Sequence, residues 1–103
     1  MSIRSVSKRV ALEVLERDGY CINCGSPYNP DIAHFIGRGQ GGLGIKENLA
    51  VLCRTCHHAL DNGNNETIKS CIHATFKAYL KSHYPDFTDD MRKERNRWDT
   101  EEL

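Results

Sequence analysis

The sequence predicts an α+β fold in which a hairpin of two short strands is followed by a helix, linked by a four-cysteine zinc site and surrounded by further helices. Two observations predict it. First, the chain contains two CxxC motifs, Cys21 with Cys24 and Cys53 with Cys56, and two such pairs in one small domain are typical of structural zinc. Second, residues 32–62 read as an apolar run, a Gly-rich stretch, another apolar run and a helical pattern.

The length of the chain predicts its domain organisation, and its net charge limits how it could bind DNA. The 103 residues predict one domain over residues 1–103, with a core of about 20–63 and a helical C-terminal extension of about 64–98. A chain this short builds a thin core, which favours stabilisation by a metal. The 14 basic and 14 acidic side chains leave no net charge, so binding to DNA would depend on a local basic patch.

The sequence contains no membrane or export signal that we recognise. No apolar run approaches the roughly 20 residues of a membrane span, and the first residues lack a signal-peptide pattern. We therefore expect no membrane partner and a cytoplasmic location, where the five cysteines stay reduced.

The first helix is expected over about residues 5–18, because Val6, Val10 and Val14 recur at helical spacing. Gly19 suits its left-handed end. Residues 20–26 then carry the first CxxC on a tight turn, and Gly25 allows the chain to turn sharply there.

The hairpin follows. Residues 32–36 predict the first strand, whose alternation places Ile32, His34 and Ile36 on one face and Ala33 and Phe35 on the other. Residues 37–44 are too rich in Gly for regular structure and predict a loop. Residues 49–52 predict the returning strand, and a helix is expected from residue 53 or 54 to about residue 62.

The C-terminal part predicts two more helices. Asn64 or Asn65 can cap a helix that ends near His83, before Pro85. Its apolar stripe contains Ile68, Cys71, Ile72, Phe76, Tyr79 and Leu80. Thr88 can cap a last helix over residues 89–98.

The cysteines carry the clearest chemistry. A zinc ion on the four CxxC thiolates would fix the start of the hairpin to the start of the following helix. The alternatives are a redox dithiol, which needs one CxxC in a thioredoxin-like context, and buried free thiols. Cys71 lies on the helical stripe and is expected in the core.

The order of three further segments is more specific. AHFIGRGQGG, ENLAVLC and CHHALD resemble the motif of HNH nucleases, metal-dependent enzymes with the ββα-metal (His-Me finger) fold. The resemblance is strong over residues 20–61, and the flanking sequence resembles small bacteriophage HNH proteins more loosely. It implies that His34 is the general base, Asn48 the middle residue of the motif, and His57 the last histidine and a metal ligand.

The residues of the motif are suited to phosphodiester hydrolysis. A neutral imidazole such as His34 can take a proton from water near pH 7. His57 and Asp61 lie four positions apart on the expected helix, so both can hold one Mg²⁺ or Mn²⁺. Many HNH motifs carry an Asp or His metal ligand directly before the base, where this chain has Ala33. Asp31 is the candidate to replace it, although strand alternation places it on the Ala33 face.

Asn48 is expected to hold the loop backbone rather than react, because an amide both donates and accepts hydrogen bonds; a simple turn residue is the alternative. Arg38, Arg54 and His58 are candidate DNA contacts. Lys8, Arg9 and the cluster from Arg92 to Arg97 are further candidates for backbone contacts. For any one of these side chains, a solvated surface position is the simpler interpretation.

The resemblance predicts a metal-dependent DNA endonuclease that leaves 5′-phosphate and 3′-hydroxyl ends, cutting duplex DNA with weak sequence preference. It also implies a phage setting in the bacterial host cell, in genome packaging with the terminase as partner; a restriction-like or mobile-element nuclease is the nearest alternative. Two rivals come from other classes. One is a non-catalytic zinc module that binds DNA or a protein, and the other is a thiol-redox protein.

Overall fold

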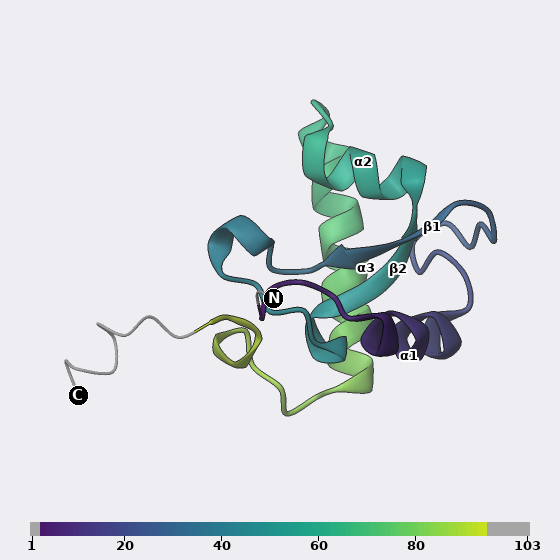
Figure 1. Cartoon of the computed structure of the whole chain (residues 1–103). Coiled ribbons are helices and arrows are strands. Elements are labelled where there is room, and N and C mark those ends of the chain that lie inside the picture. Colours follow the sequence, from purple (N-terminus) through teal and green to yellow (C-terminus); the bar gives the residue numbers. More distant parts are fainter. Residues whose placement is uncertain (1–2, 95–103) are drawn as a thin grey trace.

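The computed structural model describes residues 3–94 of the chain. Two strands form an antiparallel hairpin, and three α-helices surround it (Figure 1): α1 (Lys8–Asp18), β1 (Pro30–His34), β2 (Leu49–Cys53), α2 (Arg54–Asn62) and α3 (Glu66–His83). The predicted α+β fold, with a hairpin followed directly by a helix and flanked by others, is confirmed.

The hairpin pairs residues 30–34 with residues 53–49, so that His34 lies opposite Leu49. The predicted first strand, residues 32–36, was placed two residues too late. Phe35 still donates to the Asn48 carbonyl at 2.8 Å. Ile36, however, bonds to the Asn48 side chain instead of to a backbone group. The side chain of Asn48 therefore replaces the strand ladder at this point.

Both faces of the hairpin are covered, and every residue of β2 is buried. On one face, Leu49 and Val51 pack with Val14 of α1. On the other face, a second apolar cluster joins the hairpin to the cysteines and to α3; it contains Ala33, Ala50, Leu52, Ile72, Phe76 and Leu80. This double burial explains why residues 49–53 form an unbroken apolar run rather than an alternating one.

Capping side chains set the helix ends. Ser7 accepts from the Val10 amide at 3.2 Å and begins α1, which is three residues later than predicted. Gly19 ends α1 with a positive φ of 74°, as its position predicts. Asn65 caps α3 by accepting from the Ile68 amide at 3.1 Å. Because Ser7 stops the helix from extending backwards, residues 3–5 are left as a separate segment.

A buried ionic cluster fixes α1 to the hairpin and to α3. The Asp18 side chain is fully buried, and it pairs with Arg17 at 2.5 Å. It also accepts from the Val51 amide at 2.8 Å and from the Tyr79 hydroxyl. Arg17 in turn donates to the Leu49 carbonyl at 2.6 Å, so three elements meet at one charged pair.

Three predictions for the C-terminal part were wrong. Cys71 and Ile68, placed on the buried stripe of α3, are exposed. In place of a helix from residue 89, the chain forms a 3-10 turn, Asp90–Arg92, and Lys93 then pairs with Gly42. Residues 95–98 of that predicted helix lie outside the described residues. Within residues 3–94, no helix is long and apolar enough to cross a membrane.

Candidate active site and metal centre

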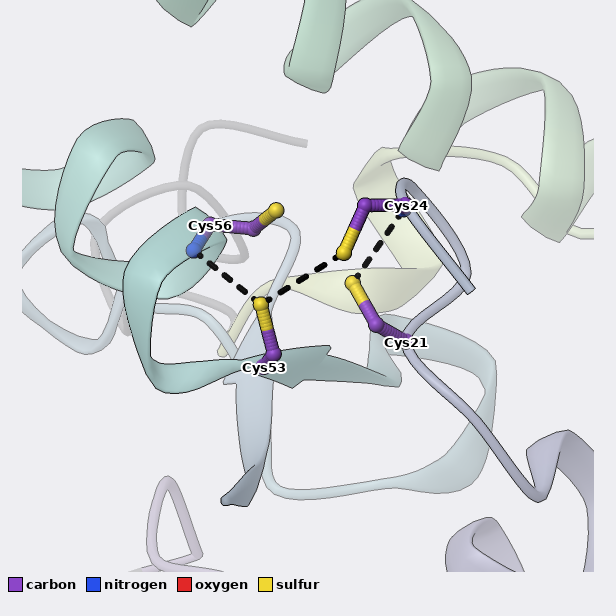
Figure 2. A group of neighbouring side chains, drawn as sticks. All are labelled: Cys21, Cys24, Cys53 and Cys56. Carbon is purple, nitrogen blue, oxygen red and sulfur yellow. Dashed lines mark hydrogen bonds between the residues drawn. The ribbon is translucent and has the colours of Figure 1, made fainter. Parts of the chain in front are cut away.

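The four cysteines of the CxxC motifs form one cluster (Figure 2). Cys21 and Cys24 lie on the turn after α1, Cys53 ends β2, and Cys56 lies in the first turn of α2. Their sulfur atoms all lie within 4.8 Å of one another, and the Sγ atoms of Cys24 and Cys53 are 3.6 Å apart. Sulfurs bound tetrahedrally to zinc at about 2.3 Å lie about 3.8 Å apart. The cluster therefore fits a structural zinc ion.

The surroundings of the sulfurs agree with this fit. Backbone amides of Cys24 and Cys56 point at the sulfurs of Cys21 and Cys53, at 3.4 and 3.5 Å, and the Asn23 amide group points at Cys56 Sγ at 3.4 Å. Burial and, to a smaller extent, the neighbouring thiols together raise the pKa of Cys56 to about 12, against the opposing effect of the Asn23 side chain. Several thiolates so close together need a cation to balance their charge.

A cavity of about 590 Å³ opens between α1, the Gly loop and α2. Four predicted site residues line it: His34, Arg38, His57 and Asp61. The start of α1, including Lys8, forms its opposite wall. The fold thus brings the base candidate, one basic residue and the two principal metal-ligand candidates to a single cavity.

His57 lies between two carboxylates. Its Nε2 is 3.0 Å from Asp61 Oδ2, and its Nδ1 is 3.1 Å from Asp31 Oδ2. Asp31 and Asp61 therefore contact opposite nitrogens of one imidazole. The spacing between His57 Nε2 and Asp61 Oδ2 also fits two neighbouring ligands of one Mg²⁺, which lie about 3 Å apart in an octahedral shell. Asp31 contacts the other ring nitrogen, away from this pair.

His34 is half-buried at the end of β1. Its Nε2 lies 2.8 Å from the backbone carbonyl oxygen of Arg4. Since a carbonyl can only accept, Nε2 carries the proton and Nδ1 keeps its lone pair. Burial lowers the pKa of His34, against the opposing effect of the Arg4 carbonyl, and the nearby charge of Arg38 lowers it further. The imidazole is therefore neutral near pH 7.

Asn48 is fully buried and does not line the cavity. Its Oδ1 accepts from the Ile36 amide at 2.9 Å. Its Nδ2 donates to the carbonyls of Ile36 and Leu43, at 3.1 and 2.9 Å. These three bonds connect both ends of the Gly loop to the start of β2, which is the holding function expected from its amide.

The candidate DNA contacts separate into two places. Arg38 is exposed and lines the main cavity. Arg54 and His58 are exposed on the other side of His57, around a smaller pocket of about 200 Å³ that also includes Asp31 and Asp61. Arg92, offered as a backbone contact, is instead buried and donates to the Glu47 carbonyl at 2.7 Å.

Ala33, the residue at the usual position of a metal ligand, is fully buried in the apolar cluster beside the cysteines. The sequence did not indicate which group accepts the hydrogen bond from His34 Nε2. Every residue has a backbone carbonyl, so no side-chain pattern could identify that of Arg4.

Comparison with known proteins agrees with the arrangement. Residues 21–63 match the family model described as HNH endonuclease. This region contains the four clustered cysteines, the hairpin and α2, whereas α1 and α3 lie outside it. No curated protein matches the chain.

Proposed function

Residues 21–63 form an HNH endonuclease domain, and on that premise we propose that the protein hydrolyses phosphodiester bonds of DNA with His34 as general base. The observation that carries the proposal is the single cavity shared by His34, Arg38, His57 and Asp61. It combines a neutral imidazole, a cation for a phosphate group and two potential metal ligands. These are the groups that hydrolysis of a phosphodiester requires.

In the proposed reaction, Nδ1 of His34 takes a proton from a water molecule. The water oxygen forms a bond to phosphorus as the bond to the 3′ oxygen breaks, and a second water protonates the leaving oxygen. The products carry a 5′-phosphate and a 3′-hydroxyl. The hydrogen bond from Nε2 to the Arg4 carbonyl supports this role, because it leaves Nδ1 as the basic nitrogen.

His57 and Asp61 are the residues that would hold the catalytic cation. Mg²⁺ or Mn²⁺ bound there would neutralise charge on the scissile phosphate and on the leaving oxygen. We assign Asp31 to a supporting role. By accepting from Nδ1 of His57, it fixes the ring with Nε2 directed toward Asp61, in the way that carboxylates orient metal-bound histidines.

Zinc on Cys21, Cys24, Cys53 and Cys56 has a structural role in this proposal. It links the turn after α1 to the start of α2, and Cys56 directly precedes His57 in the sequence. The position of His57 on α2 is therefore coupled to the zinc site formed by the four cysteines.

The proposed substrate is duplex DNA with weak sequence preference. Arg38 and Lys8, on the cavity wall, are suited to contact phosphates next to the scissile one, and such contacts carry no sequence information. The Arg54 and His58 side lies beyond His57 and would follow the same backbone further along. We propose that residues 1–103 act as one domain in the cytoplasm of a phage-infected bacterium, in genome packaging with the terminase; the looser resemblance to phage proteins supports this setting.

One observation favours a second candidate, a zinc module that binds DNA or a protein partner without cutting. Ala33 offers no ligand at the position where many HNH motifs have one, and it lies in the apolar core. This candidate requires zinc but no contribution from His34.

Nicking of supercoiled plasmid with added Mg²⁺ or Mn²⁺ tests the proposal. Wild type should nick only with added metal, and His34→Ala should lose at least about 100-fold in rate. His83→Ala, an exposed histidine on α3, is the matched control and should nick like wild type. EDTA should abolish nicking, and zinc content is measured in parallel because a chelator also attacks the cysteine cluster. Zinc-loaded wild type that binds DNA but never nicks would favour the second candidate.

A further inference from the structure

The N-terminal segment, residues 3–5, lies along the Gly loop of residues 37–44, far from it in sequence (Figure 1). The Gly44 amide donates to the Ile3 carbonyl at 3.0 Å. Arg4 Nη1 donates to the Arg38 carbonyl at 3.1 Å, and Arg38 Nη2 donates to the Ser5 hydroxyl at 3.2 Å. Three bonds therefore seat this segment before α1 begins.

This seating brings the Arg4 carbonyl to within 2.8 Å of His34 Nε2. We propose that Arg4 is a positioning residue for the nuclease reaction, because its backbone carbonyl fixes the ring of His34 with the basic Nδ1 turned to the cavity. The inference rests on the proposed function, since it assigns a role to Arg4 only if His34 is the base. It places part of the active site outside residues 21–63, the range that matches the family.

A second anchor holds the same segment from the C-terminal side. Arg4 Nε pairs with Glu94 Oε2 at 2.6 Å, and the Glu94 amide donates to the Gly41 carbonyl at 2.7 Å. The Leu43 amide also donates to the Arg92 carbonyl at 2.9 Å. Segments from both ends of the described chain therefore close on the Gly loop, with Arg4 bonded to both the loop and Glu94.

Gly44 makes room for the N-terminal segment. It is buried, and a Cβ at this position would lie 2.6 Å from the Ser5 carbonyl carbon and closer still to its oxygen. Both contacts are to backbone, so they are relieved only if the segment or the loop moves. Gly39, in the same loop, has no atom within 4 Å of the same hypothetical Cβ. Gly44→Ala and Gly39→Ala are thus a matched pair that differ in whether they displace the segment.

The test uses the full-length zinc-loaded protein, labelled with ¹⁵N and free of added Mg²⁺. We expect a protected Nε2–H signal from the His34 ring in long-range ¹⁵N–¹H spectra of wild type and Gly39→Ala. In Gly44→Ala the signal should vanish, because Nε2–H loses its acceptor and exchanges with water. With Mg²⁺, Gly44→Ala should lower kcat about 10- to 100-fold, as loss of an orienting partner does, with little change in KM.

A second variant removes the acceptor itself. It starts with Met followed by Val6, and so lacks residues 2–5 while keeping the Ser7 cap of α1. Retained zinc and helical circular dichroism identify folded protein; if Gly44→Ala does not fold, this variant decides. A His34 Nε2–H signal and a kcat that both survive in the folded variants would overturn the inference.

The two proposals fail in different ways. If wild type never nicks DNA, while the Nε2–H signal is lost in Gly44→Ala and kept in Gly39→Ala, the orienting contact stands and the nuclease role is overturned. If wild type nicks DNA and the displaced variants nick equally well with the signal unchanged, the nuclease role stands and the positioning role of Arg4 is overturned.

Discussion

Asp31 Oδ2 lies 3.1 Å from His57 Nδ1, on the ring nitrogen opposite the one that Asp61 contacts. Both ring nitrogens of His57 therefore face carboxylates, which can only accept. With a cation held between Nε2 and Asp61, as proposed, Asp31 would accept from Nδ1–H and leave the Nε2 lone pair for the metal. Asp31, in β1, thus reaches His57 in α2, the helix that follows the partner strand β2. Under the proposed function, the carboxylate two residues before Ala33 would support metal binding through His57.

Asp31→Asn should weaken Mg²⁺ or Mn²⁺ binding about 10- to 100-fold, because it removes the charge that orients His57 while keeping the side-chain size. The metal concentration for half-maximal nicking measures this. Asp61→Asn should have a larger effect, since it would remove a ligand of the proposed cation. The control is Asp86→Asn, an exposed residue after α3, which should match wild type. Equal losses in the Asp31 and Asp61 variants would instead favour direct ligation by Asp31.

The rate of cleavage should depend on pH through His34. Its pKa is lowered from the usual 6.5, chiefly by burial, and only the neutral imidazole can accept a proton. Activity should therefore fall on acidification with a midpoint below pH 6.5, as the pH drops through the lowered pKa. A cation near His34 lowers this pKa further by repelling the imidazolium. Single-turnover nicking between pH 5 and 8 measures it, and an acidic limb centred above pH 6.5 would contradict the prediction.

The lowered pKa of His34 should also make the folded protein less stable as the pH falls. His34 is harder to protonate in the folded protein than in the unfolded chain. Proton uptake at acidic pH therefore stabilises the unfolded chain more and lowers the free energy of unfolding. This contribution of His34 to the free energy of unfolding is fully present above pH 6.5, the pKa of the histidine in the unfolded chain. It decreases as the pH falls below that value. Wild type should lose more stability than His34→Gln on acidification from pH 7 to 5, by urea unfolding.

Removal of zinc should unfold the domain. Cys56→Ser breaks the cluster within α2, and we expect loss of bound zinc and of most helical circular dichroism, because metal binding and folding are coupled in such sites. The matched control is Cys71→Ser. Cys71 is an exposed free thiol on α3, so its replacement should leave zinc content unchanged and alter stability by less than about 0.5 kcal/mol. Zinc binding that survives in Cys56→Ser would contradict a four-cysteine site.

Asp18→Asn should be strongly destabilising. The substitution leaves Arg17 without its buried partner, and breaking a buried pair in this way costs about 3–5 kcal/mol. The Tyr79 hydroxyl also loses a charged acceptor. Urea unfolding measures the loss, with Glu16→Gln, an exposed residue of the same helix, as the control. A loss no larger than that of the control would show that the pair contributes nothing net.

The features predicted correctly from the sequence are those that follow from regular spacing of residues along the chain. The CxxC pairs predicted the cysteine cluster, and the Gly-rich interruption between apolar runs predicted the hairpin and the helix after it. His57 and Asp61, one helical turn apart, also meet as their spacing predicts. In each case, the residues are either close in sequence or, for the two CxxC pairs, expected to bind the same metal ion.

The rest depended on tertiary contacts between distant residues. Strand alternation placed Asp31 on the Ala33 face, but only the position of α2 shows that this face leads to His57. The basic run near Arg92 indicated a surface patch, yet Arg92 is buried because backbone carbonyls surround it. Cys71 fitted the period of α3, but the apolar cluster covers only a narrower stripe formed by Ile72, Phe76 and Leu80.

The hairpin packs against different partners on its two faces, and this limits how its sequence can diverge. Ile32 and His34 face the α1 side, whereas Ala33 packs toward the cysteines and α3. Loss or gain of one residue in β1 would exchange the faces, burying an imidazole beside the cysteines and turning Ala33 toward α1 and the cavity. Evolution along these strands is therefore expected to proceed by substitution, and changes in length should be confined to the mostly exposed residues 25–29.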